Sequence, residues 1–260
     1  MSTVEDYPKN PDYSHGRYRR RIRLTSEPGQ VHGELEDTNH GFRCTIFHDG
    51  EKVTDIQSEV LRIPFDTCPG AVEPLRKLIG LALCDDIQTL IPLTDSSSNC
   101  THLLDLALLA IRHSRRSVAE LIYDICVEDQ ADDNSPAAAE VYANGKLLHR
   151  WQTCNWEITG PDELKHKVLY KGFSKWASAC FTGEEREAAF ILQKGYFVAS
   201  ARRYNIDAQV GKAANEDRDV MLGVCFSYST PQIEIATRTA DSTRDFSNTP
   251  ELLLKFQEVN

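Results

Sequence analysis

A histidine close to two carboxylates lies in the segment Glu36-Asp37-Thr38-Asn39-His40. A carboxylate beside an imidazole orients the ring, raises its basicity and lets it exchange protons near neutral pH. The spacing therefore predicts an acid–base site in which His40 acts together with Glu36 and Asp37. In the alternative interpretation, Asp37 and Asn39 only close a turn through side-chain bonds to the backbone.

A second candidate group lies in Cys100-Thr101-His102-Leu103-Leu104-Asp105, at the start of a predicted apolar helix. The positive end of the helix dipole favours a thiolate at Cys100. His102 and Asp105 share a helix face because they are three residues apart. We expect His102 and Asp105 to be catalytic and Cys100 to contact substrate. Alternatively, because a bare buried charge is costly, Asp105 is a structural pin held by His102 or by an arginine.

Two arginines are candidates for binding an acidic group of a substrate. Arg62 ends a predicted strand, and Arg19 lies in the arginine-rich segment 18–24. Guanidinium groups bind carboxylates and phenolates through paired N–H donors. A salt bridge from Arg62 to Glu36 or Asp37 would explain the first arginine without a substrate. The positive charge that protects edge strands from aggregation would explain the second.

No familiar cofactor motif accompanies these residues. The sequence contains neither of the glycine-rich phosphate-binding loops and no nucleophile elbow, and no two of its eight cysteines form a C-x-x-C pair. We therefore expect a reaction without a cofactor. A metal held by some mixture of Asp37, His40, Cys100 and His102 stays an open alternative, because their order matches no familiar ligand spacing.

The composition restricts the class of protein. A chain of 260 residues with 41% hydrophobic and 26% charged residues is typical of a globular protein, and its net charge of −10 is the wrong sign for wrapping nucleic acid or anionic lipid. The sequence has no apolar run near the roughly 20 residues that cross a bilayer, and no secretory signal. We expect a cytoplasmic protein that binds a small molecule but neither nucleic acid nor membrane, as a monomer or a homo-oligomer.

Hairpin signals place the first candidate turn at one end of a sheet. Strands are predicted over residues 18–24, 31–37, 42–48 and 52–63, the first of them an edge strand. Asp49-Gly50 predicts a two-residue type I′ turn, whose register pairs Phe42 with Gln57. The turn before it pairs Asp37 with Phe42. This register brings Asp37, His40 and Arg62 to the same end of the sheet.

The second half of the chain echoes the first. Further strands are predicted over residues 120–127, 137–143, 146–158, 220–228 and 232–237, and helices over 71–79, 100–113, 182–203 and from 251. Ser98 or Asn99 is expected to cap the helix 100–113, and a capping box of Thr182 and Glu185 the helix 182–203.

These elements predict an α+β fold of antiparallel β-meanders packed on a central buried helix, residues 100–113. An internal pseudo-duplication of a hairpin-helix unit would account for the echo. The predicted organisation is a flexible N-terminal arm, residues 1–16, and one globular domain, residues 17–260. The units of the duplication would be residues 17–117 and 118–260.

Several motifs of the first 115 residues carry a resemblance. They are His15-Gly16, Arg19 to Leu24, the Glu36-Asp37-x-x-His40 turn, His48-Asp49-Gly50, Arg62-x-Pro64, Cys68-Pro69-Gly70-Ala71, and Cys100-Thr101-His102-Leu103 with Asp105. Together they resemble a bacterial family catalogued only as a domain of unknown function, whose members are associated with bacteria that degrade aromatic and steroid compounds. The resemblance implies a site built from residues 36–40 and 100–105. A weaker resemblance is to the γ-formaldehyde lyases that process lignin-derived phenylcoumaran dimers.

The resemblance and the residues lead to one expectation about function. We expect a cofactor-independent carbon–carbon lyase that releases formaldehyde from a lignin-derived aromatic dimer by acid–base chemistry. The alternative is a non-catalytic protein that binds a ligand or a metal in an aromatic or steroid degradation pathway.

Overall fold

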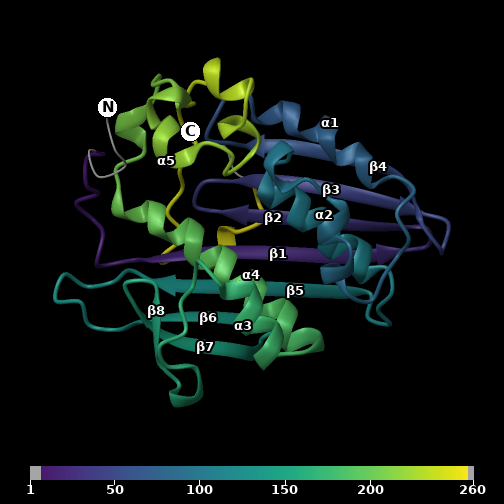
Figure 1. Ribbon diagram of the computed structural model, residues 1–260, viewed down its shortest axis with the longest axis horizontal. Coiled ribbons are helices and arrows are strands. Elements are labelled where there is room, and N and C mark those ends of the chain that lie inside the picture. Colours follow the sequence, from purple (N-terminus) through teal and green to yellow (C-terminus); the bar gives the residue numbers. More distant parts are fainter. Residues whose placement is uncertain (1–6, 257–260) are drawn as a thin grey trace.

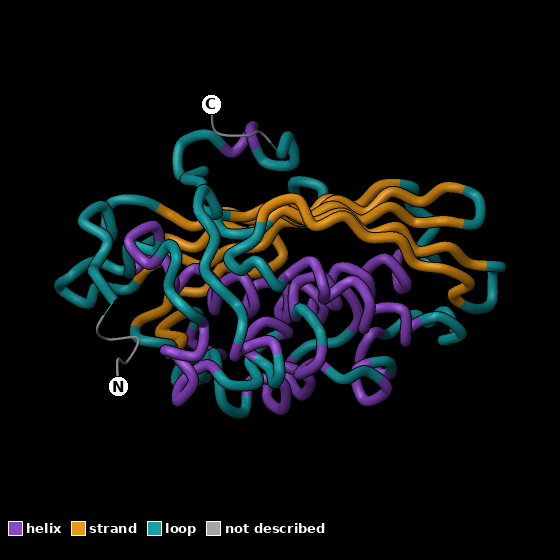
Figure 2. Tube along the Cα trace, turned by 90° about the horizontal axis from the view of Figure 1, so that it is seen from above, coloured by secondary structure: helices purple, strands orange, loops and turns teal. Residues whose placement is uncertain are grey.

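An antiparallel sheet of eight strands, in the order β4-β3-β2-β1-β5-β6-β7-β8, forms the frame of the computed structural model, which describes residues 7–256. The helices cover one face of this sheet, and the C-terminal segment crosses the other (Figures 1 and 2). The predicted α+β class is confirmed. None of the described helices is long and apolar enough to cross a membrane.

The strands are β1 (Arg17–Glu27), β2 (Gln30–Asp37), β3 (Gly41–His48), β4 (Val53–Arg62), β5 (Glu120–Glu128), β6 (Ala137–Ala143), β7 (Lys146–Cys154) and β8 (Glu157–Gly160). The α-helices are α1 (Val72–Leu75), α2 (Thr101–His113), α3 (Phe173–Cys180), α4 (Gly183–Ala199) and α5 (Arg218–Met221). Short 3-10 helices join them, including η8 (Ser200–Arg203), η9 (Asp207–Gln209) and η10 (Ala214–Asp217).

The core lies between the sheet and its two longest helices. Helix α2 packs on β1, β2 and β3, and α4 packs on β1 and β5–β7. Along β1 every second side chain from Tyr18 to Leu24 is buried beneath these helices, as the two-residue period of a strand requires. In α2 all residues from Leu106 to Ile111 are buried, which confirms the predicted central buried helix.

The position of β1 differs from the prediction. It is a central strand, because it pairs with β2 on one side and with β5 on the other. It also extends beyond the predicted range, to Glu27. Its arginines therefore do not serve to keep an exposed edge strand from aggregating. Arg21 and Arg23 are instead paired across the open sheet face with Asp124 and Glu34.

The registers around β3 also differ from the prediction. Phe42 pairs with Val60 on β4 and with Leu35 on β2, so that His40 comes opposite Asp37. The connection at Asp49 is longer than two residues, since the strand pairing closes at His48 and Val53, and Oδ1 of Asp49 accepts hydrogen bonds from the N–H groups of both Glu51 and Lys52. A bulge beside His48 absorbs the shift.

Other predicted elements are shorter or of another type. Residues 71–79 form α1 and a 3-10 turn, and residues 220–237 contain α5 and 3-10 turns where two strands were predicted. In that segment Tyr228, Ile233 and Ala236 pack on Phe65 in a small second core, so their apolar spacing reflects this packing and not a sheet.

The predicted N-cap of α2 is wrong, and that of α4 is right in position but lacks the predicted capping hydrogen bonds. The N-cap residues of α2 and α4 are Cys100 and Thr182, and neither side chain accepts a capping hydrogen bond. The amide of Asn99 is occupied because its Nδ2 donates to the carbonyl oxygen of Asp95, within the preceding turn. Nothing in the structure explains why the Thr182 hydroxyl does not accept a capping hydrogen bond.

The two halves of the sheet share a topology. Each has four consecutive antiparallel strands followed by a helix on the same face, β1–β4 with α2 and β5–β8 with α4, and β1 meets β5 at the centre (Figure 1). That the halves arose by duplication stays a prediction. Of the predicted N-terminal arm, residues 1–6 lie outside the described range. Asn10 and Tyr13 of the remainder form hydrogen bonds to the backbone of Arg203 and Gln130.

Candidate active site

The turn between β2 and β3 brings a carboxylate and an imidazole together. Oδ1 of Asp37 accepts hydrogen bonds from the N–H groups of Asn39 and His40, both at 2.8 Å, and lies 3.1 Å from Nδ1 of His40. Asp37 therefore closes the turn, as the structural alternative predicts, and also orients the histidine ring. Because the two roles use the same oxygen, the backbone of the turn fixes the carboxylate relative to the ring.

The other oxygen of Asp37 is held by two side chains of β1. Oδ2 accepts from the hydroxyl of Tyr18 at 2.7 Å and from Nε and Nη2 of Arg20 at 3.0 and 2.6 Å. Arg20 pairs with Asp37 in the sheet register, and Tyr18 lies two residues earlier on the same face. With six donors around its two oxygens, Asp37 has no free lone pair to offer.

Charge and burial fix the protonation of this cluster. Burial alone would raise the pKa of Asp37, but its electrostatic interactions with His40 and Arg20 and its hydrogen bond to His40 outweigh burial and hold that pKa well below 3.8. Burial raises the pKa of Tyr18 well above 10, so that its phenol stays a donor. Since the carboxylate can only accept, Nδ1 of His40 carries the proton between them. Nε2 is then the nitrogen that can exchange a proton with a substrate.

His102 stacks on His40. The two ring centroids are 4.0 Å apart with an angle of 25° between the planes, which confirms that the turn and the start of α2 converge. Burial, followed by electrostatic interactions with His40 and Arg20, lowers the pKa of His102 well below 6.5. His102 is therefore neutral near pH 7. The ring of the buried Phe42 also stacks on His40, with 5.8 Å between the ring centroids.

Asp105 marks the more exposed rim of the site. Its partner is Lys194 of α4, in place of the His102 or arginine that the sequence predicts. The side chains of Asp105 and Lys194 are 21% and 41% exposed, whereas that of His40 is only 11% exposed. The ion pair connects α2 and α4, and the charge of Lys194 acts on His102, three residues before Asp105 on α2.

Arg62 and Glu36 hold the turn from behind. The guanidinium of Arg62 donates to the carbonyl oxygens of three turn residues, Thr38 (2.8 Å), Asp37 (2.5 Å) and His40 (3.2 Å), and to a carboxylate oxygen of Glu36 at 3.2 Å. The other oxygen of Glu36 accepts from the N–H of Leu254 at 2.6 Å. These contacts show that both residues position the turn; the catalytic role of Glu36 and the substrate-binding role of Arg62 stay predictions.

Arg19 and Cys100 do not join the cluster. Arg19 points to the opposite face of the sheet from Arg20, where its Nε donates to the carbonyl oxygen of Ser247 at 3.1 Å. Cys100 is buried, and burial raises the pKa of its thiol, so the thiolate expected from the helix dipole does not form near neutral pH.

Tyr18, Arg20 and Lys194 belong to the site although their local sequence did not predict it. The two-residue alternation of β1 could have separated Tyr18 and Arg20 from Arg19, because only one set of side chains faces the helices. Lys194 offered no local signal, since 89 residues separate it from Asp105.

Asp37, His40 and His102 also form a candidate metal site. One ligand atom from each lies within 4.8 Å of the others. The oxygens of Asp37, however, are occupied by donors, and Nδ1 of His40 is turned toward that carboxylate. A metal would take Nε2 of His40 and His102 as its ready ligands, and Asp37 would have to give up hydrogen bonds to join them.

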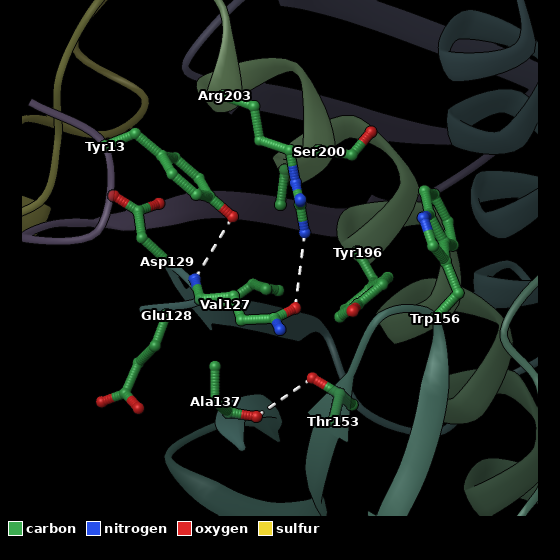
Figure 3. Close-up of a pocket in the computed structure, with 12 residues that line it drawn as sticks. Tyr13, Val127, Glu128, Asp129, Ala137, Thr153, Trp156, Tyr196, Ser200 and Arg203 are labelled. Carbon is green, nitrogen blue, oxygen red and sulfur yellow. Dashed lines mark hydrogen bonds between the residues drawn. The ribbon is translucent and has the colours of Figure 1, made fainter. Parts of the chain in front are cut away.

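A separate cavity lies beside the ends of β5 and β7 (Figure 3), lined by Tyr13, Trp156, Tyr196 and Arg203 among others. Its polar groups are largely paired with one another. The Tyr13 hydroxyl accepts from the N–H of Gln130, and the Arg203 guanidinium lies 3.4 Å from Oε1 of the same residue. None of the predicted site residues lines this cavity.

The comparisons with known proteins bear on the first half of the chain. The search of curated proteins found no match for the chain. Residues 24–115, which carry Asp37, His40 and His102, match the model of a family described as a protein of unknown function (DUF2889).

Proposed function

We propose that this chain is a cofactor-independent acid–base enzyme acting on a small aromatic molecule, with His40 as its proton-transfer group. The observation that carries the proposal is the 3.1 Å contact between Nδ1 of His40 and a carboxylate that is ionised and saturated with donors. A histidine with one nitrogen fixed in this way uses the other as a general base and then as a general acid. The neutral His102 ring stacked on it supplies a second proton-transfer group.

A formaldehyde-releasing lyase is the specific reaction that we propose for these groups. In a phenolic dimer with a hydroxymethyl side chain, an acid first protonates the departing ether oxygen while the phenol loses its proton, which gives a quinone methide. A base then takes the hydroxymethyl proton, and the carbon–carbon bond breaks to release formaldehyde. The electron pair of that bond forms the new double bond and restores the phenol after protonation, so no external oxidant is needed.

Positive charge near the rim supports this assignment. Arg19 lies on the other sheet face, and the Nη groups of Arg62 are engaged with the turn, so neither supplies the cation that stabilises a phenolate. Lys194 contributes to the electrostatic environment of His102, and although its ammonium group is paired with Asp105, its side chain is 41% exposed, in contrast to the buried Arg62. In this proposal the Lys194 ammonium stabilises the developing negative charge of the substrate.

The test is formaldehyde release from phenolic dimers that carry a hydroxymethyl group, measured for the unaltered chain and for His40→Ala and His102→Ala. We expect each variant to lose at least about tenfold in turnover, because one proton-transfer group contributes roughly 10²–10⁴-fold. His166→Ala is the matched control, since the His166 side chain is 85% exposed and bonds only to Glu157 among the described residues. Folded variants of both site histidines with unaltered turnover would overturn the proposal.

A metal-binding protein is the second candidate, favoured by the close grouping of Asp37, His40 and His102. Metal analysis of the purified protein separates the two. Stoichiometric zinc or iron that is lost in His40→Ala and His102→Ala, but kept in His166→Ala, would replace the acid–base proposal with a metal site. Activity that survives exhaustive chelation would favour the acid–base enzyme.

A further inference from the structure

A small polar cavity lies in the irregular part of the chain between η8 and the C-terminal segment, apart from the His40–His102 pair. Its volume is about 30 Å³, and its main polar lining residues are Tyr7, Gln209, Lys212, Glu216, Asp217 and Arg238. One water needs about 10–15 Å³ of such space. The cavity therefore has room for a molecule of a few heavy atoms.

Three buried polar atoms around this cavity have no hydrogen-bond partner in the described part of the chain. They are Nε2 and Oε1 of Gln209, a side chain of η9 that is only 1% exposed, and Oδ1 of Asp217, which ends η10. Folded proteins pair nearly all of their buried polar groups. The atoms include a donor and two acceptors, so an occupant must offer both kinds of group.

The buried charges of the cavity are also left without a direct counter-charge among the described residues. Oδ2 of Asp217 accepts from the phenols of Tyr7 and Tyr228, and burial with the Asp217 hydrogen bond raises the pKa of Tyr7 to about 12, so it stays neutral. The guanidinium of Arg238 donates to the Tyr228 hydroxyl at 3.3 Å and lies 4.6 Å from the centre of the Phe65 ring. Tyr228 thus stands between a buried anion and a buried cation.

The rim adds one charge of each sign. Lys212 and Glu216 are both exposed at the cavity, so that the lining carries two positive and two negative groups. A plain anion would compensate Arg238 and leave Asp217 without a partner, and a plain cation would do the reverse. Leaving either buried charge unpaired is costly. A ligand with both charges compensates both residues.

We infer that this cavity binds a small zwitterion, an α-amino acid of the size of glycine or alanine. The carboxylate lies against Arg238, whose forked donors suit it, and accepts from Nε2 of Gln209. The ammonium group donates to Oδ1 of Asp217 and to Oε1 of Gln209. The ligand so placed satisfies all three unpartnered atoms.

The test is calorimetric titration of the full chain with four probes: glycine, acetate, methylamine and glycolate. Acetate lacks the ammonium group, methylamine lacks the carboxylate, and glycolate has a hydroxyl in place of the ammonium. We expect glycine to bind at least about tenfold more tightly than each of the others, because each loses a hydrogen bond to a charged group. Asp217→Asn and Gln209→Met should each weaken glycine binding by a similar factor. Asp219→Asn, an exposed neighbour outside the cavity, should leave it unchanged.

Each other result would overturn the inference. No heat with any probe would mean that the cavity holds ordered water only. Acetate or glycolate binding as tightly as glycine would mean a simple carboxylate site. Glycine binding that Asp217→Asn and Gln209→Met leave intact would place the ligand elsewhere. If either variant fails to fold by circular dichroism, the comparison of the four probes on the unaltered chain decides alone.

Discussion

The Asp37–Arg20 pair allows a quantitative test of how the site is built. Both side chains are buried, 0% and 3% exposed, and their atoms approach to 2.6 Å. Asp37→Asn keeps the shape of the side chain but removes the charge, and it leaves the Arg20 guanidinium buried without a counter-charge. The new NH₂ group would also face donors on whichever side it took, because both carboxylate oxygens now accept hydrogen bonds.

Removing one partner of a buried ion pair costs about 3–5 kcal/mol. We therefore expect Asp37→Asn to lower the free energy of unfolding by that amount. Arg20→Met should destabilise as well, and the double variant should be less unstable than the sum of the two, with a coupling of roughly 0.5–3 kcal/mol.

Urea unfolding, followed by tryptophan fluorescence, measures these differences. Asp55→Asn is the control, because the Asp55–Arg76 pair is exposed and its atoms are 3.9 Å apart. Its loss should change stability by less than about 0.5 kcal/mol. If Asp37→Asn were as mild as this control, or if its effect and that of Arg20→Met were simply additive, the argument that a buried charge pair fixes the turn would be wrong.

Three further predictions concern the core. Folding lowers the pKa of His102 well below 6.5, so the unfolded chain binds a proton at this ring more readily than the folded chain does. The free energy of unfolding should therefore reach its full value above about pH 6.5 and fall below that pH, by up to about 1.4 kcal/mol per pH unit. His102→Gln should flatten this dependence of stability on pH. Gly195→Ala should destabilise the fold by about 1–3 kcal/mol, although alanine has the better helix propensity, because the new Cβ would lie 2.8 Å from Cγ2 of Ile125. A higher midpoint temperature of thermal unfolding in this variant would contradict the argument from packing. Glu187→Gln should cost about 3–5 kcal/mol in urea unfolding because that buried carboxylate binds two arginines and Tyr123; a change under about 1 kcal/mol would show that the network contributes little.

The sequence by itself determined the elements whose contacts are local. Apolar alternation predicted β2, β3 and β6, and the density of apolar residues predicted a buried α2, because burial of one face needs no knowledge of which element covers it. The pairing of Asp37 with His40 is of the same kind. The Asp37 carboxylate closes the turn by accepting from the backbone of His40, and this brings it within reach of the imidazole of the same residue, so the spacing alone predicted the contact.

Only the tertiary structure decided which distant groups share the site. The central position of β1 depends on β5, about 100 residues later. The β1–β2 register then sets Arg20 opposite Asp37, and the alternation of β1 keeps Tyr18 on that face and turns Arg19 to the other. Arg62 became a support for the turn because the β3–β4 register ends there. Asp105 met Lys194 because α2 and α4 lie on the same sheet face. Strand pairing and helix packing join residues far apart in the chain through the balance of the whole core, and no local spacing records that balance.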